Sequence, residues 1–322
     1  MPKVAYFTLQ PENEADELIR CAPDGYEVTV YPADISDEKK ASVVSDVDFL
    51  MLFPGKISEK VLRAAHGVKL IQLVSAGFDD IDTDLCAELD IPVANNGGTN
   101  AIDVAEHTVA LILGAYRRLT ELTRKTSANE WSGHQTGSNT YTIHGKTVGI
   151  IGFGHIGRQV ARILRGFGAY LVYTDVNPGS HELEREVRVS RVSMTELLQS
   201  SDIVTLHVPL SEDTRHLIGR RELVFMKPTA LLVNTCRGSV IDETALIRVL
   251  SERRILGAAL DVLETEPPAE DNPLLTMENV LLTPHVAGVT RDTWRRRGEF
   301  IFRNMQRVWE GYPPVAAVKV ES

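Results

Sequence analysis

Short continuous apolar runs, separated by helical or polar segments, fill the first hundred residues. The runs predict strands over residues 4–8, 27–31, 49–53, 70–74 and 91–94, and the segments between them predict helices over 14–21, 37–45, 58–65 and 84–88. Because the apolar residues are continuous rather than alternating, they are typical of a parallel sheet that is buried on both faces. This part of the chain therefore predicts a small α/β domain of its own.

A second series of apolar runs begins at residue 147 and predicts a larger sheet. Six strands are expected, over residues 147–151, 170–174, 203–206, 230–234, 257–260 and 280–282, with helical segments between most of them. Six strands in such a series fit a full doubly wound domain. Turn-forming residues at 95–100 and 284–288 are candidate hinges, and a helix over 290–310 is free to return to the first domain.

The predicted architecture is therefore an α/β chain of two domains. A doubly wound Rossmann nucleotide-binding domain, residues 100–288, is inserted into a smaller flavodoxin-like α/β substrate-binding domain, residues 1–99 and 289–322. A cleft between two hinged domains is a common way to exclude water from a bound ligand.

The segment between the two series predicts one long helix over residues 101–123, followed by a polar, irregular stretch over residues 125–144. An irregular segment of that length is unusual in a compact domain. Two interpretations stay open: an arm that packs on a second subunit with Trp131 as its anchor, or a surface loop that packs on its own chain.

The glycine pattern at residues 152–157 follows a predicted strand and precedes a predicted helix. In a dinucleotide site Gly152 permits the tight turn, Gly154 lets the backbone approach the pyrophosphate, and Gly157 lets helix and strand pack closely. Asp175, about 20 residues further on, is placed to accept hydrogen bonds from the adenosine ribose. No Arg or Lys occurs over residues 176–184, which favours NAD over NADP.

Composition narrows the class of protein. The 322 residues carry a formal net charge of −10, which opposes nucleic-acid binding. The three cysteines, Cys21, Cys86 and Cys236, have no metal-like spacing, so we expect no metal site and a reducing, cytoplasmic location. No apolar stretch approaches about 18 residues, so no membrane span is expected.

Three side chains near the ends of late strands are candidates for chemistry: Arg237, His285 and Glu266. Arg237 follows the strand at 230–234 and can clamp a carboxylate, although an Arg paired to a structural acid is as plausible. His285 follows the last strand and suits proton exchange near neutral pH, although a lone His is more often structural. Cys236 is interpreted as a small packing residue beside the cofactor, since hydride transfer needs no nucleophile.

A carboxylate beside His285 would stabilise the imidazolium and fix its tautomer. Glu266 and Glu264 are rivals for this position from spacing alone, and a solvated loop acid is the alternative for either.

Together these segments resemble the D-isomer-specific 2-hydroxyacid dehydrogenases over nearly the whole chain. The resemblance is carried by the glycine pattern with Asp175 and by six further segments: 75–79, 100–107, 207–210, 234–238, 259–267 and 283–288. It implies that Arg237 binds the substrate carboxylate and carbonyl, that His285 is the acid/base, and that Glu266 rather than Glu264 pairs with His285. It also implies a homodimer that joins through the nucleotide domains.

The resemblance implies further binding residues. The backbone of Ser75, Ala76 and Gly77 would hold the substrate carboxylate, Asp261 the nicotinamide carboxamide, and His155 and Ile156 the pyrophosphate. The remaining positions expected along the cofactor are His207, Val208, Pro209, Thr214, Thr235, Cys236 and Gly288, with Arg237 and His285 beside them.

The predicted function is an NAD-dependent D-2-hydroxyacid dehydrogenase that reduces a small 2-oxo acid, such as glyoxylate or hydroxypyruvate. Two alternatives stay open: oxidation of phosphite or another small anion on the same scaffold, and a non-catalytic NAD(H)-sensing scaffold protein. The leading prediction requires that His285 and Arg237 meet on one bound anion.

Overall fold

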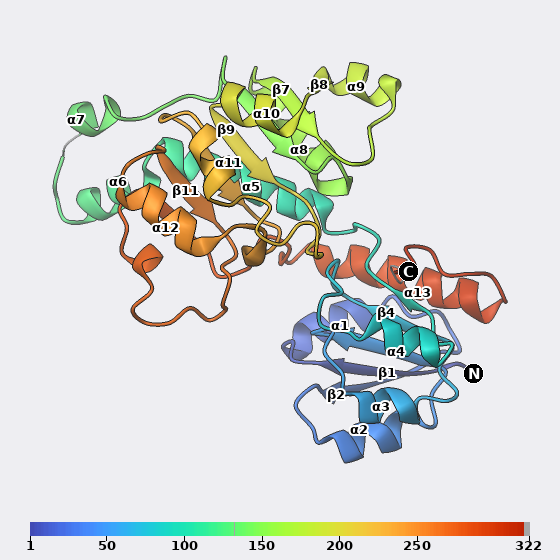
Figure 1. The fold of residues 1–322 in the computed structure, drawn as a ribbon. Coiled ribbons are helices and arrows are strands. Elements are labelled where there is room, and N and C mark those ends of the chain that lie inside the picture. Colours follow the sequence, from blue (N-terminus) through green and yellow to red (C-terminus); the bar gives the residue numbers. More distant parts are fainter. Residues whose placement is uncertain (132, 319–322) are drawn as a thin grey trace. The chain divides into compact units, whose positions relative to one another are not determined.

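The computed structural model describes residues 1–131 and 133–318, and the chain divides into two compact units (Figure 1). The first unit contains Met1–Asn100 and Val289–Ser322, and the second contains Ala101–Gly288. These bounds lie one residue from the expected domain boundary at 99/100 and coincide with the one at 288/289. The roles assigned to the two units stay predictions.

The first unit is built on a five-stranded parallel sheet with the order β2-β1-β3-β4-β5, which is the strand order of flavodoxin-like domains. Strands that are apolar along their whole length must be packed against other elements on both faces of the sheet. Two hydrophobic clusters, each formed by strand and helix residues, do this. Helices α2, α3 and α4 contribute to one cluster, and α1 and α13 contribute to the other. The strands are β1 (Lys3–Thr8), β2 (Glu27–Pro32), β3 (Phe49–Phe53), β4 (Leu70–Leu73) and β5 (Val93–Ala94). The helices are α1 (Glu12–Ile19), α2 (Asp37–Val44), α3 (Glu59–Ala64), α4 (Thr83–Glu88) and α13 (Thr293–Trp309).

The second unit is a doubly wound parallel sheet with the order β12-β11-β10-β9-β6-β7-β8. All its strands are parallel, and the order in which successive strands are added reverses between β6 and β9. Ligands of such sheets bind outside the carboxyl ends of the strands at that point. The strands are β6 (Thr147–Ile151), β7 (Tyr170–Thr174), β8 (Val189–Arg191), β9 (Ile203–Leu206), β10 (Leu231–Asn234), β11 (Gly257–Leu260) and β12 (Val280–Leu282).

The expected count of six strands in this unit was wrong. The additional strand, β8, has three residues, of which two are exposed, and it pairs in parallel with β7 at the sheet edge. So short and polar a segment carries no apolar run, and only its pairing with β7 makes it a strand.

Helices cover both faces of the second sheet. Helices α5 and α8 contribute to one hydrophobic cluster, and α10, α11 and α12 contribute to the other. The helices are α5 (Ala101–Tyr116), α8 (His155–Gly166), α9 (His181–Val187), α10 (Met194–Ser200), α11 (Arg220–Phe225) and α12 (Glu243–Ser251), with 3-10 turns at Gly238–Val240 and Pro273–Leu275.

The single long helix expected over 101–123 is two helices. Helix α5 ends at Tyr116, and α6 (Leu119–Ser127) begins after Arg118, whose left-handed backbone (φ 50°) breaks the hydrogen-bond ladder. Every residue of α6 is at least partly exposed, so no core continues the α5 packing.

The stretch expected to be irregular over 125–144 is partly helical. It contains the end of α6 and the short helix α7 (Gly133–Gly137), and Ser132 lies outside the described residues. Trp131 is 87% exposed. That exposure leaves its side chain available to a second subunit, and the choice between arm and surface loop stays a prediction.

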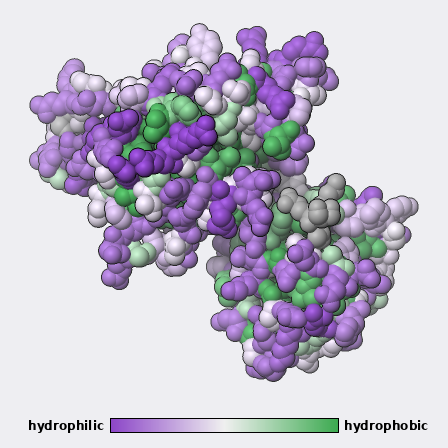
Figure 2. Space-filling model, viewed as in Figure 1, coloured by the Kyte–Doolittle hydropathy of each residue, from purple (hydrophilic) through white to green (hydrophobic). Residues whose placement is uncertain are grey.

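Hydrophilic residues predominate on the face shown in Figure 2, with smaller apolar patches on each unit. Most of the large apolar side chains are instead buried in the clusters that cover the two sheets. Within the described part of the chain, none of the helices combines the length and the apolar character that crossing a membrane requires.

Candidate active site

The glycine turn between β6 and α8 is shaped for close contacts. A Cβ at Gly152, where φ is 91°, would lie 2.5 Å from the carbonyl oxygen of His207, and a Cβ at Gly157 would lie 2.2 Å from the carbonyl oxygen of Gly152. Around Gly154, by contrast, no described atom outside its own stretch of chain lies within 4 Å of a Cβ position. Two of the glycines therefore permit tight packing, and the third leaves open space.

That open space lies at the start of α8, where Gly154 is the N-cap residue and no described side chain caps the helix. The first backbone N–H groups of a helix have no partner within it, and they attract anions. His155 is exposed and Ile156 half-buried in this first turn. The turn thus fits the pyrophosphate of a dinucleotide.

Asp175 directly follows β7, and backbone N–H groups hold its carboxylate beside the glycine turn. Phe153 N donates to Oδ2 at 2.5 Å, and Asn177 N donates to Oδ1 at 2.7 Å. The sequence scan over 176–184 missed one cation: Arg191, on the unpredicted strand β8, donates from Nη2 to the carbonyl oxygen of Asp175 at 2.9 Å. The pairing of β7 with β8, rather than sequence distance, brings Arg191 here.

His207 follows β9 and is buried with 9% exposure. Its Nε2 lies 2.9 Å from Thr205 Oγ1, whereas Nδ1 is buried and has no hydrogen-bond partner among the described residues. Burial lowers the pKa of His207 to about 3, so the imidazole is neutral at physiological pH. An orphaned polar atom at the carboxyl end of β9 is a further feature that fits a cofactor crevice.

Other residues expected along the cofactor are held by local contacts. Thr214 Oγ1 donates to the carbonyl oxygen of Pro209 at 2.6 Å, while Val208, beside His207, is half-buried. Thr235 Oγ1 lies 2.9 Å from Thr108 Oγ1 of α5. Cys236 is buried, and burial raises its pKa to about 11, which keeps it a thiol and fits the packing interpretation.

The structure brings His285 and Glu266 together. His285 Nδ1 lies 2.7 Å from Glu266 Oε2, and the other carboxylate oxygen accepts a hydrogen bond from Leu263 N at 3.0 Å. Burial raises the pKa of Glu266, but the hydrogen bonds from His285 and Leu263 outweigh it and leave that pKa below its ordinary value. The rival carboxylate, Glu264, pairs instead with His216.

Asp261 is 1% exposed and organises the turn that carries His285. Oδ1 accepts hydrogen bonds from Thr283 Oγ1 at 2.5 Å and Val286 N at 3.0 Å, and Oδ2 accepts one from Ala287 N at 2.8 Å. The backbone carbonyl of Asp261 accepts His285 N at 2.7 Å. Oδ2 therefore keeps capacity for one further donor.

The groups around this carboxylate favour its ionised form. Burial raises the pKa of Asp261, but its polar contacts, led by those with His107 and Thr283, lower it to below its ordinary value overall. Sequence reasoning gave Asp261 a role in cofactor binding and missed its contacts to the His285 turn. Its position one residue after β11 could have indicated them, since β11 and β12 are neighbours.

Arg237 lies in the turn after β10, where Asn234 Nδ2 donates to its carbonyl oxygen at 2.9 Å and Arg237 Nη1 donates to the carbonyl of Cys236 at 2.7 Å. The next residue touches the loop that carries Glu266: a Cβ at Gly238 would lie 1.9 Å from the carbonyl carbon of Leu263. Arg237, Glu266 and His285 all belong to the second unit, as does Gly288 at its last position.

The expected substrate loop lies in the first unit, directly after β4. Ser75 Oγ donates to the carbonyl of Gly77 at 2.8 Å, and Asn95 Nδ2 donates to the carbonyl of Ala76 at 3.0 Å. These bonds fix the shape of the loop. Its meeting with Arg237 and His285 of the second unit stays a prediction.

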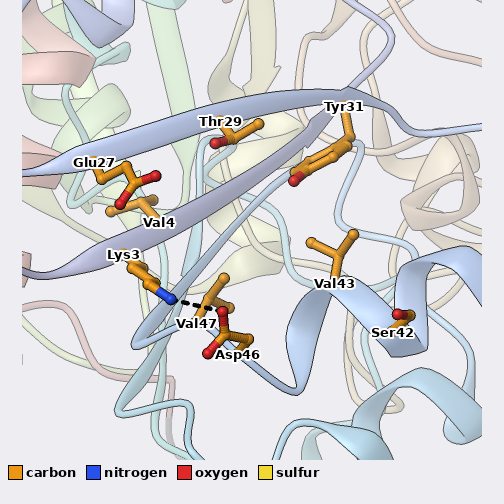
Figure 3. Close-up of a pocket in the computed structure, with 9 residues that line it drawn as sticks. All are labelled: Lys3, Val4, Glu27, Thr29, Tyr31, Ser42, Val43, Asp46 and Val47. Atoms are coloured by element: carbon orange, nitrogen blue, oxygen red, sulfur yellow. Dashed lines mark hydrogen bonds and ion pairs between the residues drawn. The ribbon is translucent and has the colours of Figure 1, made fainter.

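The first unit also has a cavity of about 200 Å³ between β1, β2 and the end of α2 (Figure 3). An ion pair joins Lys3 Nζ to Asp46 at 2.6 Å at its rim. None of the residues expected to bind cofactor or substrate lines this cavity, so it is separate from the predicted site.

Comparisons with known proteins find relatives that match nearly the whole chain. A family model described as "D-isomer specific 2-hydroxyacid dehydrogenase, NAD binding domain" matches residues 109–287. A glyoxylate reductase of Korarchaeum cryptofilum is 37% identical over 301 residues, which cover 92% of this chain and 90% of the relative. A glyoxylate reductase of Thermococcus gammatolerans is 36% identical over 328 residues, 99% of this chain and 96% of the relative. Among solved structures, a glyoxylate reductase from Paecilomyes thermophila has a TM-score of 0.83 and 30% identity, and the match covers 99% of each chain.

Proposed function

Because this chain belongs to the D-isomer-specific 2-hydroxyacid dehydrogenase family, whose members are oxidoreductases that act on CH–OH groups, we propose that its substrate is a small 2-oxo acid such as glyoxylate or hydroxypyruvate. The observation that carries the proposal is the 2.7 Å contact between His285 and Glu266 in the turn after β12. A histidine held by a carboxylate is the proton carrier that reduction of a carbonyl requires.

When bound, a reduced nicotinamide ring supplies the hydride for this reaction. The protein supplies the proton. Because Nδ1 of His285 is engaged with Glu266, Nε2 is the nitrogen that gives its proton to the carbonyl oxygen of the substrate. Glu266, whose lowered pKa keeps it ionised, stabilises the imidazolium before that transfer.

Binding is assigned to the remaining residues. The guanidinium of Arg237 clamps the substrate carboxylate and polarises the adjacent carbonyl, and backbone N–H groups of residues 75–77 bind the same carboxylate. The Gly152–Gly157 turn holds the pyrophosphate of the cofactor, and the spare lone pair of Asp261 Oδ2 accepts from the carboxamide.

We propose NADH as the preferred cofactor. The acidic side chain of Asp175 would repel a 2′-phosphate, and the side chain of Arg191 is bound to the Asp175 carbonyl. The expected result is a higher kcat/KM with NADH than with NADPH, and Asp175→Ala should narrow that ratio. A higher kcat/KM with NADPH in the wild type would contradict this preference.

We also propose a homodimer that forms through the second unit, with residues 125–144 as the arm. The 87% exposure of Trp131, a large apolar side chain, supports it. A Trp131→Ala variant that keeps the wild-type mass in sedimentation equilibrium would argue against the arm. The cytoplasmic location stays a prediction from the cysteine content.

The function is tested by the initial rate of NADH oxidation with glyoxylate, hydroxypyruvate, pyruvate and bulkier 2-oxo acids, with phosphite and NAD as the competing reaction. The His285→Gln variant should lose about 100-fold or more in kcat. His181→Gln is the matched control, since His181 also pairs with a carboxylate, that of Glu184, but is not among the residues expected to bind cofactor or substrate. Wild-type turnover by His285→Gln would show that His285 is not the proton carrier. Turnover of phosphite but of no 2-oxo acid would show that the proposed substrate class is wrong.

A further inference from the structure

A second histidine reaches the turn that carries His285, and the reaction as described above does not use it. His107 lies on α5, and its Nε2 is 3.0 Å from Thr283 Oγ1 and 3.5 Å from Asp261 Oδ1. Thr283 and Asp261 are themselves joined at 2.5 Å. His107 is thus the outer member of a three-residue network whose innermost carboxylate is 1% exposed.

The hydrogens of this network can be assigned by counting donors. A hydroxyl has one hydrogen, and an ionised carboxylate can only accept. Thr283 therefore gives its hydrogen to Asp261, and its oxygen must accept from His107. His107 carries a hydrogen on Nε2 and is the donor that fixes the rotation of the Thr283 hydroxyl.

The orientation of Thr283 matters because Asp261 holds an unusual backbone. His285 has a left-handed conformation, with φ 54°, which is uncommon for a residue other than glycine and persists only where the surroundings impose it. Asp261 imposes this conformation through hydrogen bonds on both sides of His285. Its backbone carbonyl accepts one from His285 N, and its carboxylate accepts one each from the N–H groups of Val286 and Ala287.

From these contacts we propose that His107 is a positioning residue for His285. It acts through Thr283 and Asp261: its Nε2–H orients the Thr283 hydroxyl, the hydroxyl fixes Oδ1 of Asp261, and the carboxylate holds the turn that aims the His285 ring. Helix α5 is thereby connected to the proton carrier by three consecutive hydrogen bonds. The inference rests on the proposed function, because only in that reaction does His285 carry the proton.

The test compares two substitutions of His107. His107→Leu removes the hydrogen-bond donor and keeps a side chain of similar size. His107→Gln places an amide N–H at about the position of the Nε2–H of His107. Because Arg237 rather than His285 holds the substrate carboxylate, His107→Leu should lower kcat about tenfold and change the KM of the 2-oxo acid less than about twofold. His107→Gln should recover most of the wild-type kcat. His66→Leu, at an exposed histidine of the first unit, is the matched control and should keep the wild-type kcat.

A readout without turnover separates this inference from the proposed function. In protein labelled with ¹³C-histidine, the ring signals of His285 are identified by their loss in His285→Gln. They should shift in His107→Leu and return in His107→Gln. If the wild type reduces no 2-oxo acid but the His285 signals shift in His107→Leu and return in His107→Gln, the proposed function is wrong and the role of His107 in positioning His285 is supported.

Two results would overturn the network. In the first, the wild type reduces the 2-oxo acid, as the proposed function requires, but His107→Leu changes neither kcat nor the His285 ring signals. In the second, His107→Gln is as impaired as His107→Leu, which would mean that the volume of the side chain, rather than its N–H, is what the site needs.

Discussion

The buried imidazole of His207 makes the stability of the second unit depend on pH. Its pKa falls from the ordinary 6.5 to about 3 because the ring is buried and no acid compensates the lost hydration. A folded-state pKa that is depressed contributes stability at pH values above the unfolded-state pKa. As the pH falls below 6.5 the unfolded chain takes up a proton that the folded chain refuses, so this stability is lost progressively down to the folded pKa.

The size of the effect follows from the two pKa values. A pH of about 5 lies about 1.5 units below the pKa of the unfolded imidazole, which is therefore protonated, while the folded imidazole is still neutral. This difference lowers the free energy of unfolding by about 2 kcal/mol. His207→Gln cannot take up this proton and keeps a donor for Thr205. Between about pH 8 and pH 5 the variant should therefore lose about 2 kcal/mol less stability than the wild type.

Hydrogen exchange of the β9 amides under increasing urea measures this free energy for the second unit without a contribution from the first. His66→Gln, at an exposed histidine, is the control and should follow the wild-type pH dependence. Equal losses in the wild type and in His207→Gln would refute the reasoning, because they would mean that His207 is protonated or hydrated in the folded chain.

Three further predictions concern the site. Glu266→Gln should lower kcat about 100-fold with little change in substrate KM, since His285 loses its carboxylate partner; steady-state rates of NADH oxidation measure this, and an unchanged kcat would contradict it. Gly238→Ala should destabilise the second unit by about 1–3 kcal/mol, because its Cβ would meet the backbone of Leu263, and a wild-type melting temperature in calorimetry would argue against that contact. Gly157→Ala should weaken NADH binding about tenfold by pushing the helix away from the strand, as followed by fluorescence titration, with wild-type affinity as the contrary outcome.

The sequence by itself determined the two sheets and the nucleotide turn. Continuous apolar runs predict buried parallel strands because both faces of each strand need cover, and that requirement is local. The glycine pattern likewise reflects contacts within one strand, one turn and one helix, and the structure gives Gly152, Gly154 and Gly157 the close approaches and open space that their positions suggested.

Tertiary structure decided what depends on neighbours that are distant in sequence. Strand β8 has too few apolar residues to be visible alone and exists because β7 pairs with it, and that pairing brings Arg191 to Asp175. Spacing left Glu264 and Glu266 equivalent, and only the path of the loop gives His285 to one and His216 to the other. The contact of His107 with Thr283 spans 176 positions, so no local pattern could encode it. Such contacts arise from how the strands are ordered in the sheet and how α5 lies against it, which hydrophobic periodicity does not specify.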